Sequence, residues 1–256
     1  MYNAFSVNYD RFVNWQERLA FELPFLESQL QSLVQDGNLP RVLDSACGTG
    51  QHALALAQHG YPAAGADYAA GMIEQAEKNR AAIGLNVPFA VAGFGEMAGA
   101  FGEQSFDALL CLGNSLPHVL NAADLLSAVQ DFADVLRPGG LLLVQNRNFD
   151  AVLASRERWM GPQPASEGDR EWLFVRFYDF LPDGTIDFNI LTLYRQGTEP
   201  WRQQAAVTRL MPWREVELTQ VLARCGFTDI TLYGGLDGSP FSAETSGNLV
   251  ISARKG

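Results

Sequence analysis

The chain alternates short, uninterrupted apolar runs with longer segments whose apolar residues recur every three or four positions. The apolar runs predict buried strands, and they lie at 41–44, 62–67, 87–91, 106–112 and 141–145. The intervening segments predict helices that begin after Gly50, near Ala69 and near Ala122. Strands that alternate with helices in this way favour a parallel sheet that is covered on both faces.

The pattern changes after Asp150. Two aromatic and β-branched runs, 172–180 and 185–195, are joined by Leu-Pro-Asp-Gly, which is typical of a hairpin turn. The first run places apolar side chains on both of its faces, so we expect an antiparallel insertion that covers the core or lies between copies of the chain. A segment with helical spacing and two further apolar runs then close the chain.

Composition and charge narrow the class of protein. With 256 residues, 47% of them hydrophobic, the chain can bury a sizeable core. Eighteen Lys and Arg residues against 29 Asp and Glu residues give a net charge of −11, which argues against nucleic acid and anionic membranes as partners. The three cysteines show no metal-ligand spacing, and the N-terminus reads as neither a signal peptide nor a membrane anchor. We therefore expect a cytoplasmic protein without a metal site.

The segment most informative about chemistry is VLDSACGTGQH, residues 42–52, in which a buried strand ends in a loop of small residues that opens a helix. Small residues at Ala46, Gly48 and Gly50 let the backbone turn tightly and approach a ligand closely. Asp67 ends the next strand, 23 residues after Asp44, where a carboxylate can accept hydrogen bonds from both ribose hydroxyls of an adenosine. Loop and acid together predict a nucleotide-type cofactor.

The order of residues in the loop separates two classes of cofactor site. A dinucleotide loop commonly reads G-x-G-x-x-G, without an acid at the end of the strand before it. Here Asp44 precedes the small residues as D-S-A-C-G-T-G, and this resembles the first motif of class I S-adenosylmethionine-dependent methyltransferases. Asp67 matches the ribose-binding acid of that family, and the segments 106–112 and 136–144 match its fourth and fifth strands. The resemblance implies S-adenosyl-L-methionine as cofactor and S-adenosyl-L-homocysteine as product.

The resemblance also implies the fold class: an α/β, doubly wound, seven-stranded, mostly parallel sheet (a Rossmann-like methyltransferase fold) with a small antiparallel β insertion after strand five. We expect four divisions of the chain. They are an N-terminal helical cap at 1–38, a cofactor-binding core at 39–150, the antiparallel insertion at 151–211, and a C-terminal helix with the closing hairpin at 212–256.

Three segments resemble a narrower group. CLGNSLPH (111–118) and NRNFD (146–150) look like glycine and glycine/sarcosine N-methyltransferases, and NYDRFVNW (8–15) is similar to the N-terminal helix with which several small-molecule methyltransferases cover the cofactor. This implies an enzyme that methylates a small-molecule acceptor, with the amine of glycine, sarcosine or a similar amino acid as first candidate. The alternatives are another small acceptor methylated on nitrogen or oxygen, a noncatalytic S-adenosylmethionine-binding protein, and an NAD-dependent oxidoreductase.

The loop and the resemblance assign a set of cofactor-binding residues. The set is Tyr9, Trp15, Asp44, Ala46, Gly48, Gly50, His52, Asp67, Tyr68, Met72, Phe94, Gly95, Leu112 and Asn114. The family commonly places an acid after the third strand to meet the adenine amino group, but this chain reads AGFGEM at 92–97. Either Phe94 contacts the adenine ring or Glu96 replaces the acid, and the sequence leaves both open.

The residues on the acceptor side follow from what an amino acid needs. Its carboxylate requires a cationic or amide partner, and its amine must be deprotonated and oriented. Asn148 and Arg147 at the end of the fifth strand are the first candidates, Arg176 in the insertion is a second guanidinium, and His118 follows the loop after the fourth strand. Direct displacement needs no covalent residue, so we assign no catalytic nucleophile, and Cys47 serves as a small residue.

Overall fold

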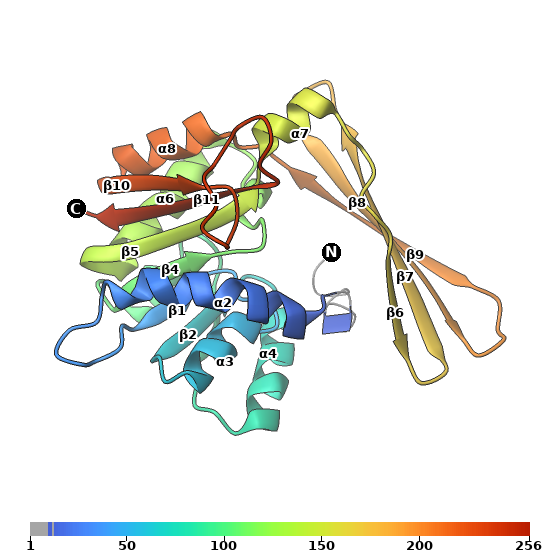
Figure 1. Ribbon diagram of the computed structural model, residues 1–256, viewed down its shortest axis with the longest axis horizontal. Helices are drawn as coiled ribbons and strands as arrows, with labels where there is room; N and C mark the ends of the chain where they lie inside the picture. The colour runs from blue at the N-terminus through green and yellow to red at the C-terminus, as the bar shows by residue number, and fades with distance from the viewer. Residues whose placement is uncertain (1–9, 12) are drawn as a thin grey trace.

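One large sheet forms the centre of the protein in the computed structural model, which describes residues 10, 11 and 13–256. Its seven strands are β1 (Val42–Asp44), β2 (Ala63–Asp67), β3 (Phe89–Val91), β4 (Phe106–Cys111), β5 (Leu136–Arg147), β10 (Phe227–Tyr233) and β11 (Asn248–Lys255). They lie side by side in the order β10-β11-β5-β4-β1-β2-β3 (Figure 1). β11 is antiparallel to both of its neighbours, and the other pairings are parallel. The predicted mostly parallel α/β sheet is confirmed.

Helices cover both faces of the large sheet. They are α2 (Trp15–Gln31), α3 (Gln51–Gln58), α4 (Ala70–Ile83), α5 (Met97–Phe101), α6 (Ala122–Val135), α7 (Phe149–Ser155) and α8 (Glu215–Arg224), with the 3₁₀ turn η1 (Leu116–His118). Successive residues of a strand point to opposite faces, so Leu142 and Val144 of β5 pack with α6 and α8, and Leu141 and Leu143 pack with α2 and α3. No helix in the described part of the chain is long and apolar enough to span a bilayer.

The expected insertion forms a second, four-stranded antiparallel sheet. Its strands are β6 (Gln163–Glu167), β7 (Arg170–Phe180), β8 (Ile186–Gln196) and β9 (Arg202–Leu210). β7 and β8 correspond to the two predicted strands, and the turn between them places Gly184 at φ 85°, a conformation that glycine adopts easily. β6 and β9 were not predicted, because their sequences are largely polar. Figure 1 shows this sheet standing to one side of the large one.

The second sheet is fixed to the core at the carboxyl edge of the large sheet. A small cluster of buried apolar residues joins Phe149 of α7 to Tyr178, Ile186 and Leu210 of the second sheet. Beyond β9, the Met211 backbone N–H donates to the carbonyl of Pro117 in η1 at 2.8 Å. These contacts turn one face of the sheet towards the core. We call this the inner face, and Arg176, Tyr178, Phe188, Ile190 and Thr208 lie on it.

Candidate active site

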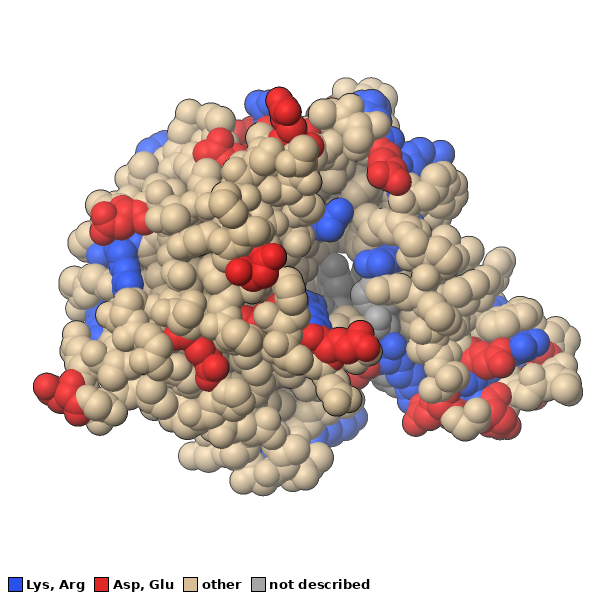
Figure 2. All heavy atoms as spheres, viewed as in Figure 1, with Lys and Arg blue, Asp and Glu red and all other residues tan. Residues whose placement is uncertain are grey.

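A cleft of about 1220 Å³ lies between the carboxyl edge of the large sheet and the inner face of the second sheet. Figure 2 shows the hollow between these two parts of the molecule, with basic side chains on its walls. The volume exceeds the range of roughly 300–1,000 Å³ that is typical of a pocket for one small molecule. The cleft therefore has room for two ligands. Parallel sheets bind their ligands at this edge, because the loops that follow neighbouring strands converge there.

Asp44, at the end of β1, is a buried carboxylate. It is 1% exposed, and neither of its oxygens accepts a hydrogen bond from the described residues. Burial raises its pKa to about 6, and His52 and the amide of Ala46 act in the opposite direction. A buried acid in this state is stabilised by any cationic or hydrogen-bond-donating ligand that reaches it. The adjacent residues Ser45, Ala46 and Gly48 line the cleft.

Asp67, at the end of β2, lies on the cleft and is tied to the loop after β1. Its Oδ2 accepts the backbone N–H of Gly48 at 3.0 Å, and its Oδ1 accepts that of Ala69 at 2.9 Å. Burial raises the pKa of Asp67, and these two amides oppose the shift. The carboxylate is thus held in one orientation next to Tyr68 and Met72, which also line the cleft. Its position at the strand end is the one expected for a ribose-binding acid.

Two charged residues of α2, Arg18 and Glu22, also line the cleft. Arg18 Nε donates to Glu22 Oε1 at 2.9 Å, and Glu22 Oε2 lies 2.6 Å from His52 Nε2. Burial pushes the pKa of Glu22 up, but His52 and Arg18 outweigh burial, so the net pKa is lowered. Sequence reasoning missed both residues. The available signal was a charged pair four positions apart within a helix that also buries apolar residues.

The segment after β3 lines the cleft through Gly93 and Phe94. Phe94 packs edge-to-face on Phe132, with ring centroids 5.4 Å apart. Gly95, a predicted cofactor residue, instead donates its N–H to Asp131 at 2.8 Å and does not line the cleft. Glu96, the other candidate for the adenine, accepts the N–H of Gly93 at 2.8 Å. Asp131 and Glu96 thus fix the backbone of this segment, and the side chain of Phe94 lines the cleft.

Five more residues of the predicted cofactor set do not line the cleft, namely Trp15, Asp44, Gly50, His52 and Leu112. A Cβ on Gly50 would lie 2.6 Å from the ring of Phe89, so glycine is required there for packing. Leu112 is buried in the core. Trp15 packs on His52, with ring centroids 5.4 Å apart, and His52 holds Glu22. A direct contact of these residues with the cofactor stays a prediction, and Tyr9 lies outside the described residues.

Two arginines and a tyrosine line the wall of the cleft that lies opposite the loop after β1. Arg147 ends β5, and its backbone N–H donates to Asn114 Oδ1 at 2.9 Å, which fixes the strand end against the loop after β4. Arg176 and Tyr178 lie on the inner face of β7, and all four residues line the cleft. Burial lowers the pKa of Arg176, and the positive charge of Arg147 lowers it further. The two positive charges on this wall of the cleft favour an anion as ligand.

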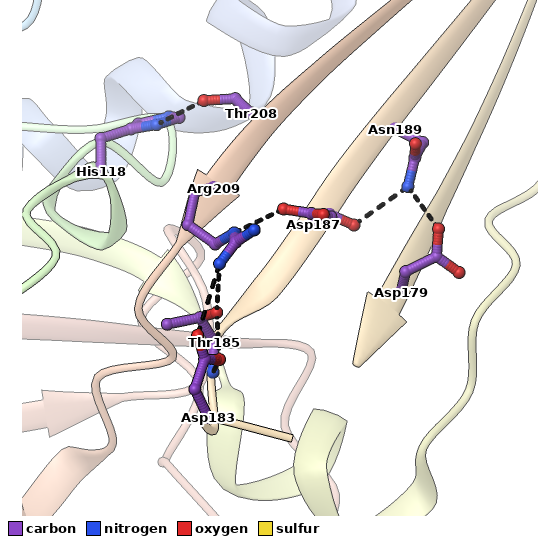
Figure 3. A network of polar contacts seen from close by, with 8 residues as sticks. All are labelled: His118, Asp179, Asp183, Thr185, Asp187, Asn189, Thr208 and Arg209. Carbon is purple, nitrogen blue, oxygen red and sulfur yellow. Dashed lines mark hydrogen bonds and ion pairs between the residues drawn. The ribbon is translucent and has the colours of Figure 1, made fainter. Parts of the chain in front are cut away.

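His118 ends η1 and lines the same wall (Figure 3). Its Nδ1 lies 3.5 Å from Thr208 Oγ1 on β9. Burial lowers the pKa of His118 to about 4, so the ring is neutral near pH 7. Figure 3 also shows Arg209, the next residue of β9, whose Nε donates to Asp187 Oδ1 at 2.6 Å and which reaches Asp183. This pair fixes β9 against β8, so the network holds the wall in place.

Asn148, a predicted acceptor residue, has a structural role instead. It caps α7 by accepting the N–H of Ala151 at 3.4 Å. Its side-chain amide donates to the carbonyls of Ser242, Ala243 and Ser246 at 3.2, 3.0 and 2.9 Å. The side chain is 1% exposed and does not line the cleft. The hydrogen-bonding groups of Asn148 are thus already used within the fold, and its contact with an acceptor stays a prediction.

The comparisons with known proteins were made on the sequence and on the fold. Residues 42–140 match the model of a family described as methyltransferase domain. The chain is 26% identical over 238 residues to a glycine/sarcosine N-methyltransferase of Aphanothece halophytica, covering 90% of this chain and 81% of that protein. It is 30% identical over 151 residues to a glycine/sarcosine N-methyltransferase of Halorhodospira halochloris, covering 59% of this chain and 54% of that protein.

A solved structure agrees over the full length. It is an S-adenosylmethionine-dependent methyltransferase from Clostridium acetobutylicum, which superposes with a TM-score of 0.77 at 16% identity and covers 100% of this chain and 99% of that one. At this identity the likeness concerns the fold. The sequence comparisons match a methyltransferase domain and two N-methyltransferases, and the fold resembles that of a methyltransferase structure.

Proposed function

We propose that this chain, an S-adenosylmethionine-dependent methyltransferase, transfers the methyl group to the amine nitrogen of glycine, sarcosine or a similar amino acid. The observation that carries the proposal is the pair of guanidinium groups, Arg147 and Arg176, across the cleft from the loop after β1. A carboxylate bound there brings an attached amine to the middle of the cleft.

The loops at the carboxyl edge fit the cofactor. The buried carboxylate of Asp44 suits the ammonium group of the methionine part, and Arg18 on the cleft suits its carboxylate. Asp67 suits the ribose hydroxyls, and Phe94 suits the adenine ring. When bound, S-adenosyl-L-methionine supplies a methyl group that is activated by its sulfonium. The residues around it need only bind, orient and exclude water.

The opposite wall orients the acceptor. Arg147 and Arg176 bind its carboxylate, as guanidinium groups do in charge-assisted pairs. The neutral ring of His118 presents a hydrogen-bonding nitrogen beside the amine, and the low pKa of His118 means that it does not carry the positive charge that would repel an ammonium. The amine must lose its proton to attack, and it does so before or on entering the cleft. The second sheet shields this step from water.

The two similar N-methyltransferases support an amine as the acceptor. A different small acceptor, on nitrogen or oxygen, is the second candidate. The inner face supports this second candidate, because its residues belong to the second sheet, the segment that most often sets substrate specificity in such folds.

The test has two stages in the same preparation. Calorimetric titration with S-adenosylhomocysteine should give binding, and thermal protection by S-adenosylhomocysteine but not by NAD excludes an oxidoreductase. A methyl-transfer assay with glycine, sarcosine, other amino acids, simple amines and phenols should then give turnover with the amino acids. Binding with turnover of phenols alone would overturn the proposed acceptor, and binding without any turnover would indicate a noncatalytic binder.

A further inference from the structure

The inner face of the second sheet carries apolar side chains beside the guanidinium pair. In the register of β7 and β8, Tyr178 lies opposite Phe188 and Arg176 lies opposite Ile190. Cross-strand partners project from the same face, and all four side chains line the cleft. Next to the anion site, therefore, the wall of the cleft is made of an aromatic and an aliphatic side chain.

Apolar residues also face this wall from the core. Val119 and Leu120 follow η1, whereas Met160 lies beside β7, where its N–H donates to the carbonyl of Arg176 at 3.1 Å, and all three line the cleft. Leu120 is 41% exposed, so part of its apolar side chain is open to a ligand in the cleft. The polar groups of this region, His118 and Thr208, lie within 3.5 Å of each other. The space between the two walls, lined by Val119, Leu120, Met160, Phe188 and Ile190, is the apolar chamber.

An acceptor as small as glycine does not fill the apolar chamber. Glycine and sarcosine have no side chain, so a molecule held by Arg147 and Arg176 leaves the half-buried Phe188 and the exposed Leu120 against water. Each methylene group that an acceptor buries there improves its binding roughly fourfold. The cleft volume of about 1220 Å³ leaves space for such a side chain next to the cofactor.

We propose that the acceptor is an amino acid with an apolar side chain, of the size of leucine or phenylalanine, whose carboxylate lies on Arg147 and Arg176 and whose side chain fills the apolar chamber. The inference rests on the proposed function, because it assumes that the guanidinium pair holds a carboxylate. It goes further in naming Phe188 and Leu120 as the residues that determine specificity.

The test compares kcat/KM for glycine, sarcosine, leucine, phenylalanine and phenethylamine by the release of S-adenosylhomocysteine. We expect leucine or phenylalanine to exceed glycine and sarcosine by at least about tenfold, because several methylene groups are buried. We expect phenethylamine, which lacks the carboxylate, to fall at least about tenfold below phenylalanine.

Two variants on the same strand test the chamber itself. Phe188→Ala should lower the ratio of kcat/KM for phenylalanine to that for glycine by at least about fivefold. Leu193→Ala changes a residue of β8 on the outer face, opposite Leu173, and should leave that ratio unchanged. Calorimetric binding of S-adenosylhomocysteine checks that both variants are folded.

Each of the other outcomes contradicts one specific part of the proposal. Glycine or sarcosine as the best acceptor overturns the apolar chamber and leaves the proposed function standing. Phenethylamine equal to phenylalanine overturns the carboxylate contact and, with it, the role of Arg147 and Arg176. Turnover of no amino acid, with S-adenosylhomocysteine still bound, overturns the proposed function, and this inference with it.

Discussion

The backbone N–H of Gly48 donates to Oδ2 of Asp67 across 3.0 Å, so the small-residue loop after β1 and the acid at the end of β2 form one unit. The two residues are 19 positions apart in the chain, and the parallel pairing of β1 with β2 brings them together. The carboxylate is therefore oriented before any ligand arrives. Preorganised groups of this kind bind ligands without a further cost in side-chain entropy.

Replacing Asp67 tests its place in the cofactor site. Asp67→Asn keeps the size of the side chain and removes the charge, so hydrogen bonds from ribose hydroxyls weaken. We expect the affinity for S-adenosylhomocysteine to fall by roughly 1–3 kcal/mol in calorimetric titration. Asp36→Asn, in an exposed turn, is the matched control. Unchanged affinity in Asp67→Asn would remove this residue from the site.

Asp44 makes the stability of the ligand-free protein depend on pH. Its pKa, raised by burial to about 6 from an ordinary value of 3.8, means that the folded state binds a proton that the unfolded state has lost between these two values. Stability is therefore greatest below pH 3.8 as far as this group is concerned, and it falls as the pH rises through 6. Asp44→Asn should stabilise the ligand-free protein at pH 7 by about 1–3 kcal/mol.

The same substitution should weaken cofactor binding, because the carboxylate is lost as partner of an ammonium group. Thermal unfolding at pH 4.5 and pH 7, with and without S-adenosylhomocysteine, measures both effects. A variant that is less stable at pH 7 and binds the ligand as before would show that Asp44 is a structural residue.

Substitutions of Arg147 and Arg202 distinguish a residue of the proposed acceptor site from an arginine outside it. Arg147→Gln removes one of the two guanidinium groups on the cleft, so KM for an amino acid acceptor should rise about tenfold or more while affinity for S-adenosylhomocysteine stays the same. Arg202→Gln breaks only an exposed pair with Glu199 on β9, and we expect it to behave as the unmodified protein. A loss of cofactor affinity in Arg147→Gln would move this residue to the cofactor side.

The sequence indicated most of the site because parallel strands bring their carboxyl ends to one edge. Asp67, Arg147 and His118 lie at or just beyond such ends, so chain position alone predicted where they meet. Arg18 and Phe188 reach the cleft only through the packing of α2 and the register of β8. No local pattern encodes these long-range contacts.

For some residues of the right type in the right region, the sequence could not separate a ligand contact from a structural role. Asn148 follows a strand and precedes a helix, and an asparagine there is equally suited to bind a ligand or to cap the helix. Gly50 is similar, since a glycine in a loop serves either close approach of a ligand or close packing, here against Phe89. Only the neighbours in space decide between the two.

Asn148→Ala should therefore reduce stability and not selectivity. The substitution removes a helix cap and leaves three carbonyls of the loop near Ser246 without their donor. The free energy of unfolding should fall by about 2–4 kcal/mol in chemical denaturation. At a temperature where the variant remains folded, KM for the acceptor should match that of the unmodified protein. A large rise in KM without loss of stability would restore the original assignment.

His118 supplies the opposite pH dependence to Asp44. Burial lowers the pKa of His118 from 6.5 to about 4, so the folded state binds fewer protons than the unfolded state in this range. The stability from this group is complete above pH 6.5 and is lost as the pH falls towards 4. His118→Gln keeps a hydrogen-bonding group towards Thr208 and does not titrate. The loss of stability between pH 6.5 and pH 4.5 should therefore be smaller in the variant, by about 1–3 kcal/mol.

The same variant reports on catalysis. Because His118 is neutral near pH 7, the rise of kcat/KM above pH 6.5 should follow the deprotonation of the acceptor amine and keep its shape in His118→Gln, with a reduced rate from poorer orientation. Phe or Ala in place of His118 would change packing as well, so glutamine is the sharper choice. If the pH profile of the unmodified enzyme instead contains a step near pH 6.5 that disappears in His118→Gln, the ring takes up a proton in the active complex. His118 would then act as a base, and its surroundings would have to be more polar than the ligand-free cleft indicates.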